Sequence, residues 1–224
     1  RQFCEQLDYN LLFRWFLDLE MDEPSFDAST FSRNRERLIH HEVAEQFLAA
    51  IVADAKKDRL LSPDHFSVDG TLIESWASMK SFRPKDGPPG GDSNGWSDFR
   101  GEKRSNETHA SVTDPEARLA RKGPGREAKL AYSTHGLMEN RNGLLIDLVV
   151  STADGFAERR EGAKLIAKLA GSRRKTVGAD KGYDATDFVE ACRQAGVTPH
   201  VAPNVHAGRL HSAIDRRTAR HHSF

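Results

Sequence analysis

A change in the character of the chain begins at residues 66–73, which read FSVDGTLI. Apolar and β-branched residues in such a short run favour a β-strand, and Asp69 lies within it. Two further β-like runs follow at about 129–138 and 144–150, joined by residues 139–143, which read ENRNG. Asn-Gly supplies the positive φ that a tight hairpin needs, so these two runs are predicted to pair antiparallel.

Helical and strand-like patterns alternate through most of the remaining chain. The predicted elements are two helices, at about 162–169 and 184–195, and two strands, at 176–179 and 197–201. We expect Asp184 to cap the second helix. The resulting order, βββαβαβ, predicts an α/β fold with a mixed sheet in the ribonuclease-H topology. A right-handed crossover in that topology places the strand bearing Asp69 beside the strand that ends at Asp180.

The first sixty residues have a different, helical pattern. Apolar residues recur at helical spacing from 7 to 19, which predicts one helix there. A second helix is expected to begin after Asp27, Ser29 or Thr30, any of which can cap it, and a third covers about 43–55. We therefore expect a small helical N-terminal domain.

Two changes in composition predict the domain organisation. Pro63 follows the helical pattern, so the N-terminal domain is assigned to residues 1–62 and the core domain to residues 63–224. Residues of about 80–127 are rich in Gly, Pro and polar side chains, and such a composition buries too little surface to order itself. A flexible, disordered insertion is therefore expected after the first strand.

Bulk composition gives only weak limits on function. The 224 residues carry 33 Lys and Arg against 33 Asp and Glu, without the basic surplus of most phosphate binders, although basic residues outnumber acidic ones beyond residue 60 by 25 to 21. Cys4 and Cys192 have neither disulfide-framework nor zinc-site spacing. No run approaches the roughly 18 apolar residues of a membrane span, so we expect a cytoplasmic protein without a membrane partner.

Asp69 and Asp180 are the residues best placed to carry chemistry. Carboxylates on neighbouring strands can share oxygen-liganded divalent cations, of which Mg²⁺ is the expected one and Mn²⁺ a substitute. Two such ions can activate a water or a 3′-hydroxyl for in-line attack on phosphorus, which cuts or joins nucleic acid. Gly70 and Gly182 suit a backbone that turns sharply or admits a phosphate closely. The alternative is that both aspartates only end strands or cap turns.

Several stretches of the chain carry a specific resemblance. They are QLDYNLLFRWF at 6–16, STFSRNR at 29–35, VDGT at 68–71, MENRNG at 138–143 and ADKGYD at 179–184. In this order they resemble the DDE transposases of bacterial insertion sequences, over nearly the whole chain. The resemblance implies a DNA transposase that cleaves and transfers strands at insertion-sequence ends, with Asp69 and Asp180 as catalytic, metal-binding aspartates.

The same resemblance implies partners and a third acid. The partners are double-stranded DNA with terminal inverted repeats and further copies of the chain on paired ends, in association with the bacterial nucleoid. The third acid is a glutamate on a helix after the last strand. Beyond Val201 the sequence offers only Asp215, in an Arg-rich stretch. The chain is therefore expected to be truncated and to lack the third catalytic acid.

Two groups of basic residues are candidate DNA contacts. They are Arg33, Arg35 and Arg37 in the N-terminal domain, and Arg118, Arg121, Lys122, Arg126 and Lys129 around residues 123–125. Cations on a helix or a flexible loop can follow a phosphate backbone. An ordinary solvated loop is the alternative interpretation of the second group.

Two other functions stay open on sequence alone. The stretch DGTL at 69–72 resembles the first motif of haloacid-dehalogenase-type phosphatases, but those enzymes need a nucleophilic aspartate where this chain has Ser67. The second alternative is a catalytically dead, truncated transposase that binds terminal DNA or inhibits the full-length enzyme. It predicts DNA binding that persists without metal and without both aspartates.

Overall fold

The computed structural model describes residues 2–86, 104–206, 209–210 and 212–215. Contacts within the chain divide it into two compact units, Arg1–Lys57 and Asp58–Phe224. Within the described residues, no helix combines the length and the apolar character needed to cross a membrane.

Four helices make up the described part of the N-terminal unit. They are α1 (Gln2–Leu7), α2 (Leu11–Phe16), α3 (Ala28–His40) and α4 (Val43–Lys57). The apolar pattern predicted a single helix over 7–19, but the helix is interrupted before Asn10, whose side chain accepts hydrogen bonds from the backbone N–H groups of Leu12 and Phe13 at 3.1 and 3.3 Å. This cap satisfies donors that the start of α2 leaves unpaired. Asp27 caps α3, as one of the three alternatives predicted, and accepts from the backbone N–H of Thr30 at 2.7 Å.

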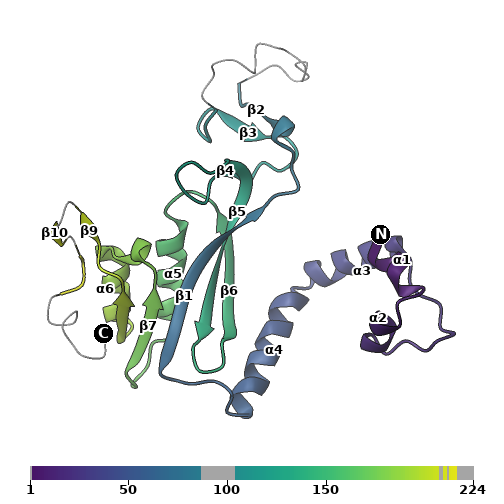
Figure 1. Cartoon of the computed structure of the whole chain (residues 1–224), viewed down its shortest axis with the longest axis horizontal. Coiled ribbons are helices and arrows are strands. Elements are labelled where there is room, and N and C mark those ends of the chain that lie inside the picture. The colour runs from purple at the N-terminus through teal and green to yellow at the C-terminus, as the bar shows by residue number, and fades with distance from the viewer. Residues whose placement is uncertain (1, 87–103, 207–208, 211, 216–224) are drawn as a thin grey trace. The chain divides into compact units, whose positions relative to one another are not determined.

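A six-stranded mixed sheet organises the second unit (Figure 1). Its strands are β1 (His65–Glu74), β4 (Arg118–Ala120), β5 (Lys129–Glu139), β6 (Leu144–Thr152), β7 (Lys175–Ala179) and β8 (Val197–Val201). Strand β1 pairs antiparallel with β5 and parallel with β7, while β5 also pairs antiparallel with β6, and β7 parallel with β8. With helix α5 before β7 and helix α6 before β8, the predicted βββαβαβ order and ribonuclease-H topology are confirmed.

Helices α5 (Ala157–Ala167) and α6 (Thr186–Gln194) pack against one face of this sheet. Ile166 of α5 and Phe188 of α6 share a single hydrophobic core with Val68 of β1. Buried and exposed residues alternate along the first half of β1, so Asp69 is exposed where Val68 is buried. Burial of this apolar face is the main force that holds the unit together.

The turn between β5 and β6 is the tight hairpin that the sequence predicts. Gly143 has a φ of 68°, in the left-handed region that glycine adopts at no steric cost. Glu139 at the end of β5 is fully buried, and its carboxylate accepts from the backbone N–H groups of Arg141 and Asn142 at 2.5 and 3.1 Å. These bonds fix the turn from inside the unit.

Part of the segment predicted to be a disordered insertion is instead ordered. Residues 80–86 and 104–127 include two short paired strands and a 3₁₀ turn: η1 (Met79–Ser81), β2 (Phe82–Pro84) and β3 (His109–Ser111). Phe82 and Ala117 are buried together with Leu130 in a small second core. These few apolar anchors order the segment despite its Gly-rich and Pro-rich composition, and residues 87–103 lie outside the described part.

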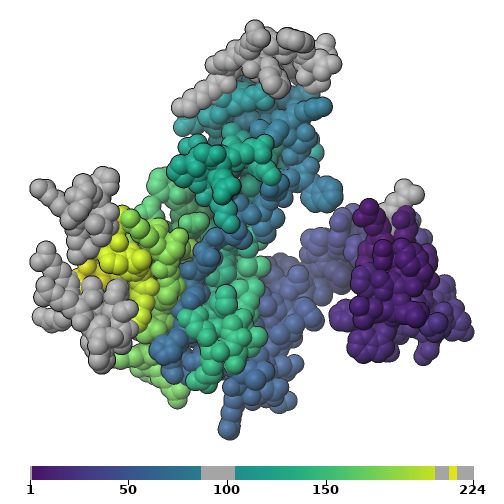
Figure 2. All heavy atoms as spheres, in the orientation of Figure 1, coloured from purple at the N-terminus to yellow at the C-terminus, as the bar shows by residue number. Residues whose placement is uncertain are grey.

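Hydrogen bonds to Asp184 link the last described residues to the core of the unit. It does not cap α6 as expected, because the N-cap position is Ala185, which makes no side-chain cap. The buried Asp184 carboxylate accepts from the backbone N–H groups of Asn204 and Ala213 and from the Ser212 hydroxyl, at 2.5, 2.9 and 3.0 Å. This segment includes β9 (Val205–His206) and β10 (Arg209–Leu210). Its yellow atoms lie against the green atoms of the preceding elements in Figure 2.

Candidate active site

The parallel pairing of β1 with β7 brings Asp69 and Asp180 to the same end of neighbouring strands. The last paired residues are Ser67 on β1 and Gly178 on β7. Asp69 and Asp180 each follow two residues later, just where the pairing of the two strands stops. The expectation that these two strands are neighbours is confirmed.

Both aspartates are exposed, and each uses one carboxylate oxygen locally. The Oδ1 atom of Asp69 accepts from the backbone N–H of Gly70 at 2.8 Å. The Oδ1 atom of Asp180 accepts from the backbone N–H of Gly182 at 2.8 Å and so caps the 3₁₀ turn η3 (Lys181–Tyr183). Each aspartate therefore keeps its second oxygen available as a hard ligand of the kind that Mg²⁺ and Mn²⁺ prefer.

A third carboxylate, Glu158, lies beside these two, and the sequence did not single it out. It stands in the first turn of α5, and its Cγ and Oε1 atoms lie 2.8 and 3.1 Å from the position that a β-carbon on Gly70 would occupy. Because Gly70 has no side chain, the Glu158 side chain can pack against β1 at the residue that follows Asp69. Partial desolvation, together with the negative charges of Asp180 and Asp69, raises the pKa of Glu158.

Tyr183, at the end of η3, packs against α5 near Glu158. The residue is fully buried, and its Cε1 atom lies 2.9 Å from the position that a β-carbon on Gly162 would occupy, one helical turn beyond Glu158. Within the described residues, its hydroxyl has no hydrogen-bond partner. Burial and then the charges of Glu158, Asp69 and Asp180 raise the pKa of Tyr183, so the phenol stays neutral and can donate.

The donor set fits a divalent cation with two direct protein ligands. The charges that shift the pKa of Glu158 are all negative, so a cation would relieve repulsion within this cluster. Among the described residues, no three His, Cys, Asp or Glu side chains lie in common metal-binding geometry. Alternation along β1 accounts for this, because Asp69 and the side of Gly70 that faces α5 point to opposite faces of the strand. Asp69 and Asp180 are the candidates for direct ligands.

An ion-pair network holds the first turns of α5, from which Glu158 projects. Arg160 donates to Asp154 at 2.6 Å and to the buried carboxylate of Glu161 at 3.0 Å. Lys164 pairs with the same Glu161 carboxylate at 2.9 Å. Because Glu161 is both buried and doubly paired, loss of Arg160 or Lys164 would leave its charge less compensated near the start of α5.

The candidate DNA contacts of the N-terminal unit all lie on one helix. Arg33, Arg35 and Arg37 lie on α3, which has no buried residue. All three side chains are therefore accessible to a ligand.

The second basic group is only partly accessible. The exposed cations on the loop between β4 and β5 are Arg121, Lys122 and Arg126. Arg118 donates to the carbonyl oxygen of Pro115 at 3.1 Å, and Lys129 forms an ion pair with Glu74 at 2.6 Å. Arg118 and Lys129 are thus less available to phosphate than Arg121, Lys122 and Arg126.

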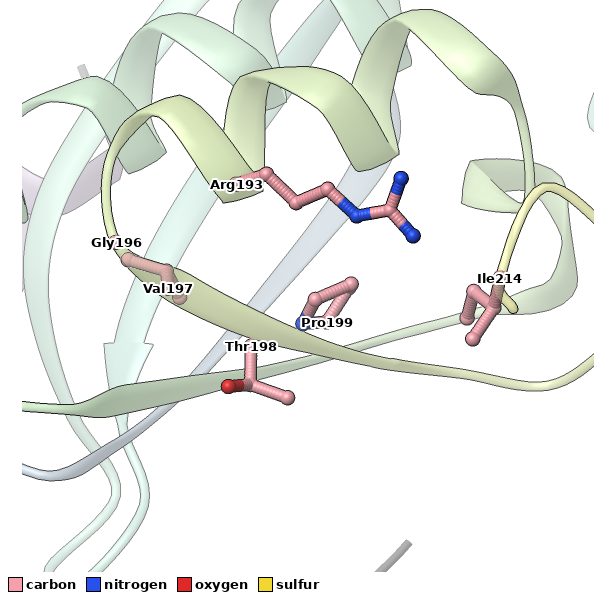
Figure 3. Close-up of a pocket in the computed structure, with 6 residues that line it drawn as sticks. All are labelled: Arg193, Gly196, Val197, Thr198, Pro199 and Ile214. Atoms are coloured by element: carbon pink, nitrogen blue, oxygen red, sulfur yellow. The ribbon is translucent and has the colours of Figure 1, made fainter. Parts of the chain in front are cut away.

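Asp215, the acid that follows β8, is engaged at the end of α6. It accepts from Arg193 at 3.1 Å. Arg193 also lines a pocket of about 250 Å³ with Ile214 and residues 196–199, as Figure 3 shows. Neither of the two candidate catalytic aspartates lines this pocket, which is therefore separate from the site described above.

This sheet order, with an aspartate on the first strand and a second one just after the neighbouring parallel strand, is typical of ribonuclease-H-like α/β proteins. The chain belongs to the transposase DDE domain family, which matches residues 96–223, more than half of its length. A transposase domain (DUF772) matches residues 1–37. The resemblance to DDE transposases is confirmed, and the haloacid-dehalogenase alternative finds no support.

A solved structure also shows similarity to this chain. The cryo-EM structure of the piggyBac transposase synaptic complex with hairpin DNA is 10% identical, with a TM-score of 0.33, and the match covers 61% of this chain. This chain spans 22% of that one, so the likeness is limited to a small part of the larger protein. Comparison with curated proteins found no match.

Proposed function

We propose that the protein is a DNA transposase that cleaves and transfers strands at insertion-sequence ends in a reaction that requires a divalent cation. The observation that carries this proposal is the β1–β7 register, in which Asp69 and Asp180 each follow the last paired residues by two positions. Membership of the transposase DDE domain family supplies the reaction class. The two aspartates are the proposed catalytic residues.

Mg²⁺ is the proposed cation, with Mn²⁺ as a substitute, because both prefer carboxylate oxygens. Asp69 and Asp180 would hold it through the oxygens that do not accept from Gly70 and Gly182. When bound, such a cation offsets charge on the phosphate and activates the attacking hydroxyl.

Double-stranded DNA with terminal inverted repeats is the proposed substrate. The accessible cations that support it are Arg33, Arg35 and Arg37 on α3 and Arg121, Lys122 and Arg126 before β5, with lesser contributions from Arg118 and Lys129. Such contacts to phosphate make affinity fall steeply as salt concentration rises. We also propose that copies of the chain assemble on paired ends, since joining two ends in one reaction requires both to be held together.

A cleavage assay on linear DNA that carries both flanks of the protein's own gene tests this function. The full-length wild-type protein should nick this DNA at defined positions with Mg²⁺ and not with EDTA. Asp69→Asn and Asp180→Asn should each lower the rate by more than about 100-fold, beyond the effect usual for residues outside the ligand set. Asp58→Asn makes the same charge change at an exposed residue and should retain cleavage.

Two results would contradict the proposal. Retained cleavage in Asp69→Asn would remove that residue from the active site. Binding of the flanking DNA without cleavage, unchanged by EDTA and by replacement of both aspartates, would favour the non-cleaving DNA-binding role.

A further inference from the structure

The packing of α5 against β1 places Glu158 against Gly70, next in sequence to Asp69. Its Cγ and Cδ atoms lie 2.8 and 3.2 Å from the position of a β-carbon on Gly70, the residue that follows Asp69. Any other residue at that position would meet the stem of the glutamate side chain. Glu158 is exposed, and its side chain makes this long-range contact with β1.

Tyr183 is an independent sign of a ligand at the same place. Its ring packs against α5 at Gly162, and its buried hydroxyl has no hydrogen-bond partner among the described residues. An unpaired buried hydroxyl costs about 1–3 kcal/mol, so such groups usually pair with a protein group, a water or an ion. Burial, and then the charges of Glu158, Asp69 and Asp180, raise the pKa of this hydroxyl.

A cation would relieve the repulsion among Glu158, Asp69 and Asp180. Glu158 is partly desolvated and repelled by two aspartates, and both effects favour its neutral form. A divalent cation reverses the sign of these interactions, because each carboxylate is then attracted to the shared charge. Mg²⁺ keeps several of its waters when it binds to proteins, so a carboxylate that is not a direct ligand can still interact with it through water.

We infer that Glu158 is the third acidic residue of the proposed cation site, where it acts on a bound divalent cation by its charge and through water while Asp69 and Asp180 are the direct ligands. This inference rests on the proposed function and deepens it. Glu158 is a positioning residue, and it is distinct from the acid after the last strand that the family resemblance implies.

Titration of the purified full chain with Mn²⁺ by isothermal calorimetry tests the inference without DNA or activity. Glu158→Gln should weaken Mn²⁺ binding by about 10- to 100-fold, the usual effect of residues behind the direct ligands. Glu158→Asp keeps the charge but shortens the side chain, so its affinity for Mn²⁺ should fall between those of the wild type and Glu158→Gln. Glu190→Gln is the matched control, since Glu190 is an exposed glutamate on α6, and it should bind as the wild type does.

A second measurement separates a role in cation binding from a role in folding. In EDTA the thermal midpoint of Glu158→Gln should equal or exceed that of the wild type, because the substitution removes repulsion. Addition of Mn²⁺ should then raise the midpoint of the variant less than that of the wild type. A variant that is less stable in EDTA and binds Mn²⁺ normally would show a structural role and overturn the inference.

The aspartate variants distinguish failure of the inference from failure of the proposed function. If Asp69→Asn and Asp180→Asn abolish Mn²⁺ binding and Glu158→Gln does not change it, Glu158 lies outside a real cation site. If neither aspartate substitution changes binding, the cation site itself is wrong, and the assignment of Glu158 fails with it.

Discussion

Gly70 and Glu158 compete for one space, since the Glu158 Cγ atom lies 2.8 Å from where a β-carbon on Gly70 would be. Gly70→Ala should therefore displace the flexible Glu158 side chain while the fold persists. We expect Gly70→Ala to lower Mn²⁺ affinity about as much as Glu158→Gln, with no further loss in the double variant, because both changes remove the same interaction. Calorimetric titration of the three variants measures this coupling. Additive losses would show that Gly70 and Glu158 act independently.

Gly162 is confined by aromatic rings rather than by a flexible acid. A β-carbon there would lie 2.9 Å from the Tyr183 ring and 3.4 Å from the Phe188 ring, both fully buried. Overpacking of this kind costs about 1–3 kcal/mol, against roughly 1 kcal/mol gained in helix propensity. Gly162→Ala should therefore lower the free energy of unfolding by about 1 kcal/mol in urea titrations. Gly123→Ala meets no atom within 4 Å and should not be destabilising.

The Asp184 carboxylate should control the order of the segment that follows β8. It accepts from Asn204, Ser212 and Ala213, and its loss would leave two backbone donors unpaired. Asp184→Ala should cost about 1.5–3 kcal/mol, the range for hydrogen bonds to a charged group. Limited proteolysis should cut within 204–215 faster in this variant, whereas Asp187→Ala, at an exposed position on α6, should leave the rate unchanged. Equal protection of both variants would mean that Asp184 does not hold this segment.

Local signals in the sequence predicted the sheet because each of them fixes local geometry. Asn-Gly at 142–143 specifies a hairpin, and the apolar runs on either side fix two antiparallel strands. The adjacency of β1 and β7 then follows from the handedness of the α5 crossover. Composition failed over 80–86 and 104–127 because Phe82 and Ala117 are enough to anchor a short paired segment.

Glu158 could not be identified in the same way. Its position depends on the packing of α5 against β1, and the predicted helix began only at about 162 whereas α5 begins at Ala157. One signal was present, because glycine inside a strand often indicates the close approach of another group. The sequence predicts that Gly70 allows either a sharp turn or the close approach of a phosphate, and the structure shows the glutamate of α5 in that space. The role of Asp184 was missed because its partners lie at least 20 residues away.

Glu139 should make the β5–β6 turn sensitive to acid. Desolvation raises its pKa, but hydrogen bonds from the backbone of Arg141 and Asn142 outweigh this and lower the pKa below its ordinary value of 4.5. A lowered folded-state pKa contributes stability that is present above the unfolded value and lost as the pH falls through the folded value. Glu139→Gln should therefore be less stable than the wild type at neutral pH. This difference in stability should shrink as the pH falls below 4.5, the ordinary pKa of glutamate. Urea midpoints measured across this range check it, with Glu190→Gln expected to follow the wild type throughout.

The hydroxyl of Tyr183 should reveal whether its partner arrives with the cation. In EDTA, Tyr183→Phe removes a buried hydroxyl that has no partner among the described residues, so the thermal midpoint should stay the same or rise. With Mn²⁺ in excess the wild type should gain stability that grows with the logarithm of its affinity, and Tyr183→Phe should gain less if the hydroxyl donates within the loaded site. Tyr132→Phe is the control, because the Tyr132 hydroxyl already donates to Asp114 at 2.6 Å, and its loss should lower the midpoint equally with and without Mn²⁺. An equal gain in Tyr183→Phe and the wild type would show that this hydroxyl stays unpaired in both states and takes no part in the site.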